Sequence, residues 1–417
     1  MTSEPALVAV RAAPATPGAW RVCIASGIVA ALSGAAIWSS TLGVFMLPLQ
    51  REFGWSRADI SLGITLMTLT TPALAPLAGW LVDRVDLRRL VLVCLLLQSL
   101  VVAAAGQVGA NVLGFYALSV AMAAVSYGAS VLPLSKIVNE WFDSARGRAL
   151  GVLFAFASLG PVIHPSLAQA LQERFSWRMA YALLASIVAA VGGAVAWRWV
   201  HERGHPEPTL TFERTTEAAK DTGAIGQLLC DRAWWALAAW GALYALGAGA
   251  IALHLVPMLS DRGASPAQAA AAMSLLGGGL LVGNLIAGAM LDRLPARALA
   301  SALMMAPVAA ALTLLLLPSV MAGIAASLLL GLSAGGESSV LTYLVGRCFA
   351  LHLYGRAYAT LTVPLALAGG AAPWVSGLLY STHGNYDIAL AIAAAAFTLA
   401  ALAPWALPQS RLGRRTQ

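Results

Sequence analysis

The sequence predicts an all-helical membrane protein in which twelve membrane-spanning helices form two homologous halves of six. Its 417 residues are 59% hydrophobic and only 10% charged, whereas soluble domains carry about 25% charged residues. Apolar runs of roughly 20 residues or more, long enough to cross the hydrocarbon core as a helix, recur along the whole chain. A short charged turn also occurs once in each half, which indicates a duplication.

The charged turn follows the second apolar run of each half. It reads Gly-Trp-Leu-Val-Asp-Arg at 79–84 and Gly-Ala-Met-Leu-Asp-Arg at 288–293, and its recurring residues are 209 positions apart. Several coincidences at one offset favour two homologous halves, a plan that is common among membrane transporters. The recurring pairs are Gly79 and Gly288, Asp83 and Asp292, Arg84 and Arg293, and Arg88 and Arg297.

The apolar runs are expected to be helices. Backbone groups in lipid must be satisfied internally, and the runs lack the two-residue alternation of barrel strands. The predicted spans are, in order, residues 22–48, 58–82, 88–108, 111–138, 148–171, 177–200, 233–258, 267–291, 298–317, 319–346, 356–380 and 386–408.

Prolines and glycines distinguish individual spans. Prolines inside the second, fourth, fifth and eleventh spans remove backbone hydrogen bonds and favour bends. Glycines crowd the seventh, eighth, tenth and eleventh spans, where they allow close helix approach. Bent, closely packed helices suit two halves that rock against each other, although static bundles contain them too.

The distribution of lysine and arginine predicts the orientation. With the N-terminus in the cytoplasm, 20 of the 25 basic residues lie inside and five outside, as the positive-inside rule requires. The net charge of +7 reflects this bias, so no nucleic-acid partner is needed to explain it. The expected division is a cytoplasmic tail (1–21), a six-helix half (22–200), a cytoplasmic linker with an amphipathic piece (201–231), a second half (232–408) and a cytoplasmic tail (409–417).

Several classes of function are disfavoured by missing patterns. The four cysteines lie in or at predicted spans with no extracellular pair, which argues against a disulfide framework or a metal site. The sequence contains no Gly-rich nucleotide loop with its Lys-Ser/Thr, and no Ser-His-Asp or paired-carboxylate arrangement at a water-exposed place. We expect neither an enzyme nor a cofactor, and a first span that is retained instead of a cleaved signal peptide.

Over essentially its whole length the chain resembles the major facilitator superfamily, most clearly in its two Asp-Arg turns. The resemblance implies a secondary transporter of a small organic solute, with its path between the two halves. It also implies that the turns form gating contacts at the cytoplasmic face; simple charge anchoring is the alternative. The expected location is a bacterial inner membrane and the expected state a monomer. The gating candidates are Asp83, Arg84, Arg88, Asp292, Arg293 and Arg297.

A narrower likeness is to the bacterial monocarboxylate porter and oxalate–formate antiporter branch. It rests on residues 43–57, on Trp-Phe and Arg-Gly-Arg-Ala within 141–149, and on Phe-Ser-Trp-Arg at 175–178. That branch implies small carboxylate substrates, often moved with protons. One residue departs from it, because Asn284 stands where the branch has a carboxylate-binding arginine in the eighth span. An asparagine offers neutral donors and an acceptor instead of a charged fork, so a neutral, zwitterionic or more hydrophobic substrate is the alternative.

Two of the ionisable residues in the predicted spans, Glu337 and His164, lie well away from the span ends. A charge at bilayer depth costs about 2.5–3.5 kcal/mol on insertion scales. Glu337, in the middle of the tenth span, is therefore a candidate for reversible protonation and proton coupling, with a structural hydrogen bond as the alternative. His164 in the fifth span is a candidate substrate or proton ligand, or only a hydrogen-bonded packing residue.

Aromatic residues supply the remaining substrate-binding candidates. The resemblance implies that the first, fourth, seventh and tenth spans line the path, and these contain Trp38, Tyr127, Tyr244 and Tyr343. Such side chains combine an apolar face with one polar tip, which suits a small organic molecule. For each residue alone packing is the favoured role, whereas two or three of the set are expected to contact the substrate.

Together these patterns predict proton-coupled alternating access that moves a small organic solute, first of all a carboxylate-bearing metabolite. The alternatives are proton-driven efflux of a hydrophobic or drug-like compound and, less favoured, a transporter-like ligand sensor.

Overall fold

The computed structural model describes residues 17–142, 146–202, 222–291 and 293–408, and the regular elements in these ranges are all helices. Twelve helical stretches among them are long and apolar enough to cross a membrane, which confirms the predicted number of spans. Most of the predicted linker (203–221), the tail residues 1–16 and 409–417, and Asp292 lie outside the described residues.

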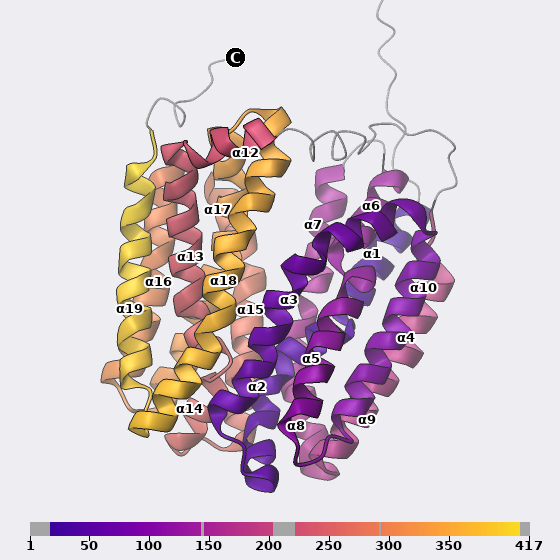
Figure 1. Cartoon of the computed structure of the whole chain (residues 1–417), viewed down its shortest axis with the longest axis vertical. Coiled ribbons are helices and arrows are strands. Elements are labelled where there is room, and N and C mark those ends of the chain that lie inside the picture. Colours follow the sequence, from indigo (N-terminus) through magenta and orange to yellow (C-terminus); the bar gives the residue numbers. More distant parts are fainter. Residues whose placement is uncertain (1–16, 143–145, 203–221, 292, 409–417) are drawn as a thin grey trace, which may run out of the picture.

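The first six spans form one bundle (Figure 1). Its elements are α1 (Pro17–Ala31), α2 (Gly34–Phe53), α3 (Arg57–Arg84), α4 (Leu87–Ala105), α5 (Val112–Ser126), η1 (Tyr127–Ala129), α6 (Val131–Trp141), α7 (Arg146–Ala157), α8 (Leu159–Arg174), α9 (Trp177–Ile187), η2 (Val188–Gly192) and α10 (Gly193–Trp199). We call this bundle the N half.

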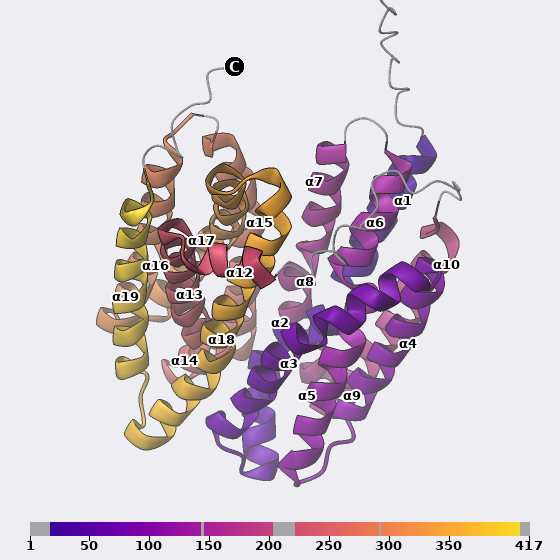
Figure 2. The same cartoon turned by 45° about the horizontal axis from the view of Figure 1, so that its top comes forward.

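The last six spans form the second bundle, the C half, which lies beside the first in Figures 1 and 2. Its elements are α12 (Thr222–Leu229), α13 (Arg232–Ala252), α14 (Leu255–Asp261), α15 (Pro266–Leu291), α16 (Ala296–Leu316), α17 (Val320–Cys348), α18 (Leu351–His383), α19 (Asp387–Leu402) and η3 (Ala403–Ala406). The first span is longer than predicted, because helix begins at Pro17 and ends at Phe53.

Several spans are broken, and proline position explains three of the breaks. Pro133, Pro161 and Pro257 are each the third residue of a new helix, α6, α8 and α14. The first N–H groups of a helix have no intrahelical partner, so a proline in this turn loses no hydrogen bond. The first span instead breaks at Leu32–Ser33, where the Ser33 hydroxyl caps α2 by accepting from the Ala36 N–H. The sequence predicted bends at Pro133 and Pro161. Before Pro133 the chain becomes extended at Ser130, whereas before Pro161 the helix is interrupted only at Ser158, which keeps helical dihedrals.

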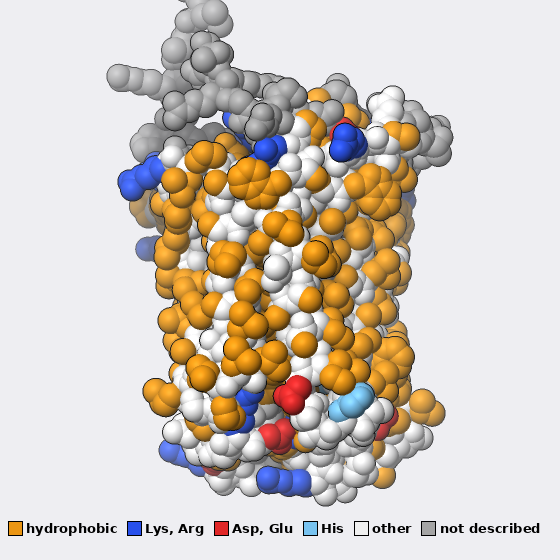
Figure 3. All heavy atoms as spheres, turned by 90° about the vertical axis from the view of Figure 1, so that its left-hand side faces the viewer, with side chains coloured by type: hydrophobic (Ala, Val, Ile, Leu, Met, Phe, Trp, Pro, Cys, Tyr) orange, Lys and Arg blue, Asp and Glu red, His pale blue; other side chains and the backbone are white. Residues whose placement is uncertain are grey.

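The outer surface is apolar around the middle of the molecule. Figure 3 shows hydrophobic side chains over the central zone and charged side chains toward the two ends. Large exposed apolar residues near the middle of their helices include Leu96 of α4, Met305 of α16 and Ile392 of α19. Such a belt is what a lipid environment requires.

A glycine seam holds α15 against α17. A Cβ atom added at Gly283 would overlap the Leu332 carbonyl, and one at Gly335 would overlap the Leu280 carbonyl. Gly279 and Gly331 face each other in the same seam. Only residues without a side chain permit this backbone approach, as in other closely packed membrane helices.

We expect Gly335→Leu to separate α15 from α17 and to lower stability by at least about 1–3 kcal/mol, the usual cost of overpacking. The measurement is the thermal unfolding midpoint of the purified protein in detergent. Gly288→Leu is the matched control, since nothing lies within 4 Å of a Cβ at Gly288. Equal unfolding midpoints for the two variants would contradict the conclusion that close packing at Gly335 stabilises the protein.

Candidate functional site

The two halves contact each other toward the end of the molecule that carries the α2–α3 loop, residues 54–56. There α3 packs antiparallel to α18: a Cβ at Gly377 would meet the Ala58 backbone, and Gly370 packs on Leu69. On the other side of the junction, α8 packs on α15, and the hydroxyls of Ser166 and Ser274 are 2.8 Å apart. We call this end the closed end.

Away from the closed end, α3 and α18 are no longer covered by each other. Leu77 of α3 is 55% exposed and Val363 of α18 is 49% exposed. Figures 1 and 2 both show the ribbons of the two halves diverging toward the opposite end, which carries α12. The structure therefore has its halves joined at one end and apart at the other.

A polar network links the halves at the closed end. Arg57, the first residue of α3, is only 5% exposed. Its guanidinium donates to both carboxylate oxygens of Asp261 in α14, at 2.7 and 2.8 Å, and to the Tyr386 hydroxyl at 2.8 Å. It also lies 3.9 Å from the ring centre of Tyr380. A bidentate arginine–carboxylate pair is among the stronger and more directional polar contacts, so these residues bind α3 to the C half.

His254 extends this network, and we call the five residues Arg57, His254, Asp261, Tyr380 and Tyr386 the Arg57 network. The histidine is fully buried at the junction of α13 and α14. Its Nδ1 is 3.0 Å from the Tyr386 hydroxyl, and its Nε2 is 2.8 Å from the Pro373 carbonyl. The sequence analysis missed this site, because Arg57 was counted only as a basic residue outside the membrane. The local signal in the sequence is His254, near the end of the predicted seventh span, with Asp261 seven residues later.

In the C half, the structure brings Asn284 onto α17. The Asn284 Oδ1 accepts from the hydroxyls of Ser338 at 3.2 Å and Ser339 at 2.9 Å, and its Nδ2 donates to the Leu280 carbonyl at 3.2 Å. The glycine seam creates this proximity by letting the two helices approach. Asn284 and Ser339 are half-buried and Ser338 is exposed, so this neutral polar group reaches the protein surface.

Glu337 lies on the same stretch of α17, directly before the two serines. It is buried, and its Oε1 has no hydrogen-bond partner among the described residues. One turn earlier, the Ser333 hydroxyl is 3.4 Å from the hydroxyl of Tyr244, a buried residue of α13 that packs on Phe397. We call residues 333–339 the polar segment of α17. Tyr343 is a further turn along, half-buried, with the Arg347 guanidinium 5.8 Å from its ring centre.

The candidates in the N half occupy separate places. Trp38 is 1% exposed and stacks on Phe115 at 5.6 Å inside the N-half core. His164 is 2% exposed, and its Nδ1 is 3.2 Å from the Ser40 hydroxyl. No hydrogen bond or ring contact within the described ranges joins either of them to the C-half candidates. Both have the surroundings of packing residues in this conformation.

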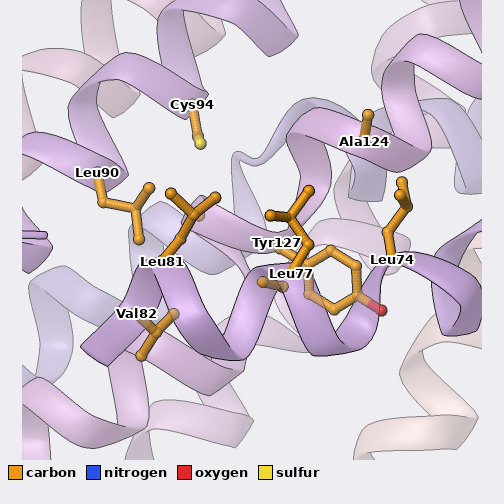
Figure 4. Close-up of a pocket in the computed structure, with 10 residues that line it drawn as sticks. Leu74, Leu77, Leu81, Val82, Leu90, Cys94, Ala124 and Tyr127 are labelled. Carbon is orange, nitrogen blue, oxygen red and sulfur yellow. The ribbon is translucent and has the colours of Figure 1, made fainter. Parts of the chain in front are cut away.

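Tyr127 lies in the short 3-10 turn η1 and donates its hydroxyl hydrogen to the Thr71 carbonyl. Its ring lines a small apolar pocket between α3, α4 and the α5–η1 stretch, with a volume of about 80 Å³ (Figure 4). The pocket is lined by Leu74, Leu77, Ala78, Leu81, Val82, Leu90, Cys94, Ala124, Tyr127 and Gly128. Its lining is suited to apolar groups.

The arginines of the duplicated turns make matching contacts within their own halves. Arg88 donates to the Trp197 carbonyl and lies 4.7 Å from that ring centre. Arg297 donates to the Leu407 carbonyl and lies 5.5 Å from the Trp405 ring centre. Each thus ties the start of the third span of its half to the end of the sixth.

The other gating candidates have fewer described contacts. Arg84 is exposed, 5.0 Å from the ring centre of Trp80, and Arg293 is exposed. The Asp83 side chain and Asp292 lie outside what the structure describes. In the described ranges no group of three or more His, Cys, Asp or Glu is placed to hold a metal ion.

Comparison with curated proteins gives relatives along most of the chain. The chain is 24% identical over 353 residues to the uncharacterized MFS-type transporter YcxA of Bacillus subtilis (strain 168), covering 82% of this chain and 84% of that protein. A shorter stretch of 152 residues, 36% of this chain and 32% of the relative, is 28% identical to the riboflavin transporter RibJ of Trypanosoma cruzi (strain CL Brener).

Solved structures share the fold. A bacterial homologue of the human lysosomal transporter Spinster, in an inward-facing and unoccupied conformation, superposes with a TM-score of 0.72 at 17% identity, covering 97% of this chain and 100% of that one. The nucleoside transporter NupG gives a TM-score of 0.75 at 13% identity, with 93% and 99% covered.

The family assignment follows from the sequence profile named Major Facilitator Superfamily, which matches residues 27–259 and 241–417. This multi-pass integral membrane protein therefore belongs to the major facilitator superfamily of transporters and is not an enzyme.

Proposed function

We propose that the protein is a proton-coupled secondary transporter that moves a small organic solute between its two halves, with Glu337 as the proton-binding group. The observation that carries the proposal is the buried, unpaired carboxyl of Glu337 within the polar segment of α17. An ionised carboxylate there would lack any compensating partner, so its protonated form is favoured. A group that gains and loses a proton as its access to water changes is what coupling requires.

The orientation belongs to the same proposal. The bias of lysine and arginine supports an orientation with the closed end outside and both chain termini in the cytoplasm. The conformation described is then inward-facing, with the Arg57 network as its outer gate. The duplicated Asp-Arg turns fall at the cytoplasmic end, where Asp83 and Asp292 remain gating candidates together with Arg84, Arg88, Arg293 and Arg297.

The neutral chemistry beside Glu337 bears on the substrate class. Asn284, Ser338 and Ser339 offer hydroxyl and amide groups without a positive charge, which suits a neutral solute that carries carbonyl or hydroxyl groups. This favours such a solute over the carboxylate-bearing metabolite that the branch resemblance implies. The similarity of one stretch to a riboflavin transporter is consistent with a neutral heterocycle. Tyr343 of α17, which is half-buried, would provide an aromatic surface for such a solute, whereas the buried Tyr244 contacts the polar segment through Ser333.

Glu337→Gln should retain exchange of substrate across the membrane and lose accumulation driven by a pH gradient, because a glutamine cannot bind or release the proton. The measurement is uptake and counterflow of labelled solutes in proteoliposomes, first screened over neutral, anionic and cationic compounds. Glu173→Gln, an exposed carboxyl on α8, is the control and should behave as the parent. Undiminished pH-driven accumulation in Glu337→Gln would remove Glu337 from the mechanism.

Asn284→Arg should shift selectivity toward carboxylates by roughly 10- to 100-fold relative to neutral solutes, since a charge-assisted hydrogen bond contributes about 1.5–3 kcal/mol. The ratio of kcat/KM values for a carboxylate and a neutral solute measures this shift. Asn284→Gln keeps the amide and should leave the ratio within a few fold. An unchanged ratio in Asn284→Arg would place the substrate elsewhere.

Arg57→Ala should raise the population of molecules that are open at the closed end, because it leaves Asp261 and Tyr386 without their donor. The effect should be smaller than the roughly 3–5 kcal/mol for breaking a fully buried pair, since Asp261 is 38% exposed. Spin labels at Gln107→Cys and Thr382→Cys, exposed positions in opposite halves, report the distance across this end after the four native cysteines are replaced by alanine.

The control for that measurement is Arg51→Ala, an exposed arginine near the same end, which should leave the distance distribution unchanged. The same distribution in Arg57→Ala as in the parent would show that the ion pair does not hold the halves together.

A further inference from the structure

The surroundings of His254 define its protonation state in this conformation. Its Nε2 is 2.8 Å from the Pro373 carbonyl, which can only accept, so Nε2 carries a hydrogen and donates it. Its Nδ1 is 3.0 Å from the Tyr386 hydroxyl. That hydroxyl already accepts from Arg57, at 2.8 Å, and is free to donate its own hydrogen to Nδ1. A neutral histidine in one tautomer therefore satisfies every group in the chain from Arg57 to Pro373.

The Ser61 hydroxyl fits the same arrangement. It donates to the Arg57 carbonyl at 2.6 Å and is 3.2 Å from the His254 Nε2, where its oxygen can share the Nε2 hydrogen. Ser61 and Arg57 belong to α3, whereas His254, Pro373 and Tyr386 belong to the C half. His254 therefore lies at the contact between the two halves, which must separate if the closed end opens.

A second proton on His254 would conflict with this geometry. Both ring nitrogens would then donate, so the Tyr386 hydroxyl would have to accept from Nδ1 and from Arg57, and its own hydrogen would lose its partner. The new positive charge would also be fully buried beside the guanidinium of Arg57.

The charged and titratable groups that face His254 are few. Within the described residues they are Arg57 from α3, Asp261 from α14 acting through Arg57, Tyr380 from α18, and Tyr386 from the loop before α19. Asp261 already has both oxygens engaged by Arg57. No carboxylate among the described residues is therefore left to neutralise a protonated His254.

We propose that His254 is a positioning residue of the gate: when neutral, it holds Tyr386 and hence Arg57 in place for Asp261, and when protonated it keeps this end open. The inference rests on the proposed function, because it requires that the closed end opens during transport. Once open, His254 meets water and titrates as an ordinary histidine, near neutral pH. Acid at this side then favours the open state, and closure requires release of the proton.

The test measures the distance distribution between spin labels at Gln107→Cys and Thr382→Cys in nanodiscs from about pH 8 to pH 5, the range in which a free histidine titrates. All proteins carry Glu337→Gln, so that the proposed coupling carboxyl contributes nothing to the pH response. Failure of Glu337 as the coupling group would appear in transport assays and would leave this readout intact.

With His254 present, the ratio of open to closed molecules should rise as the pH falls, by up to about tenfold for each pH unit below the free histidine pKa, as linkage of one proton requires. In His254→Gln and His254→Asn the closed population should persist and its ratio to the open one should not change with pH. His383→Gln, which removes an exposed histidine near the same end, should keep the pH response of the parent.

A pH response that survives in either His254 variant would overturn the proposal, as would its absence in the parent. Full opening at every pH in both variants would overturn it too, because it would give His254 a purely structural role.

Discussion

The arrangement of the halves depends on one electrostatic constraint, the compensation of Arg57. A nearly buried guanidinium needs acceptors, and the C half supplies the strongest of them, the Asp261 carboxylate and the Tyr386 hydroxyl. Among the described residues of the N half, the acceptor for the Arg57 side chain is the Gln50 side-chain oxygen, at 3.3 Å. Separation of the halves therefore exchanges protein acceptors for water. Because Asp261 is partly exposed, water can reach the pair and make this exchange, which a fully dry ion pair would resist.

The glycine seam imposes a different constraint, within one half. Gly279 and Gly283 face Gly331 and Gly335 with no space for a side chain, so α15 and α17 cannot shift much relative to each other without losing their packing. Asn284 and the polar segment of α17 therefore form one rigid body. In the proposed mechanism, this rigidity presents a solute with the same hydrogen-bonding pattern from either side of the membrane.

Most of the fold could be predicted because its signals are local. Length and apolarity identify each span, and the turns at Asp83 and Asp292 reveal the duplication. Glu337 could be proposed in the same way, since a carboxyl inside an apolar run is visible in one stretch of sequence. Trp38 was also a candidate, but its stacking on Phe115 is a tertiary contact that no local pattern shows. Arg57 was missed for the same reason, because its partners lie 204 and 329 positions away.

Glu337 and the Arg57 network lie apart in the structure, and in the proposed mechanism they have different roles in coupling. The contacts of the polar segment come from α13, α15 and α16, all in the C half. The immediate surroundings of Glu337 are therefore the same in any rigid-body position of the halves, and only its access to water can change. The Arg57 network differs, because the contacts between Arg57 and its C-half partners form only when the two halves meet. In the proposed mechanism, a proton on Glu337 alters the charge of the path, and the Arg57 network converts the position of the halves into a discrete closed state. In that mechanism Glu337 binds a proton without joining the halves. The Arg57 network joins the halves, and through His254 it responds to a proton of its own, without facing the polar segment.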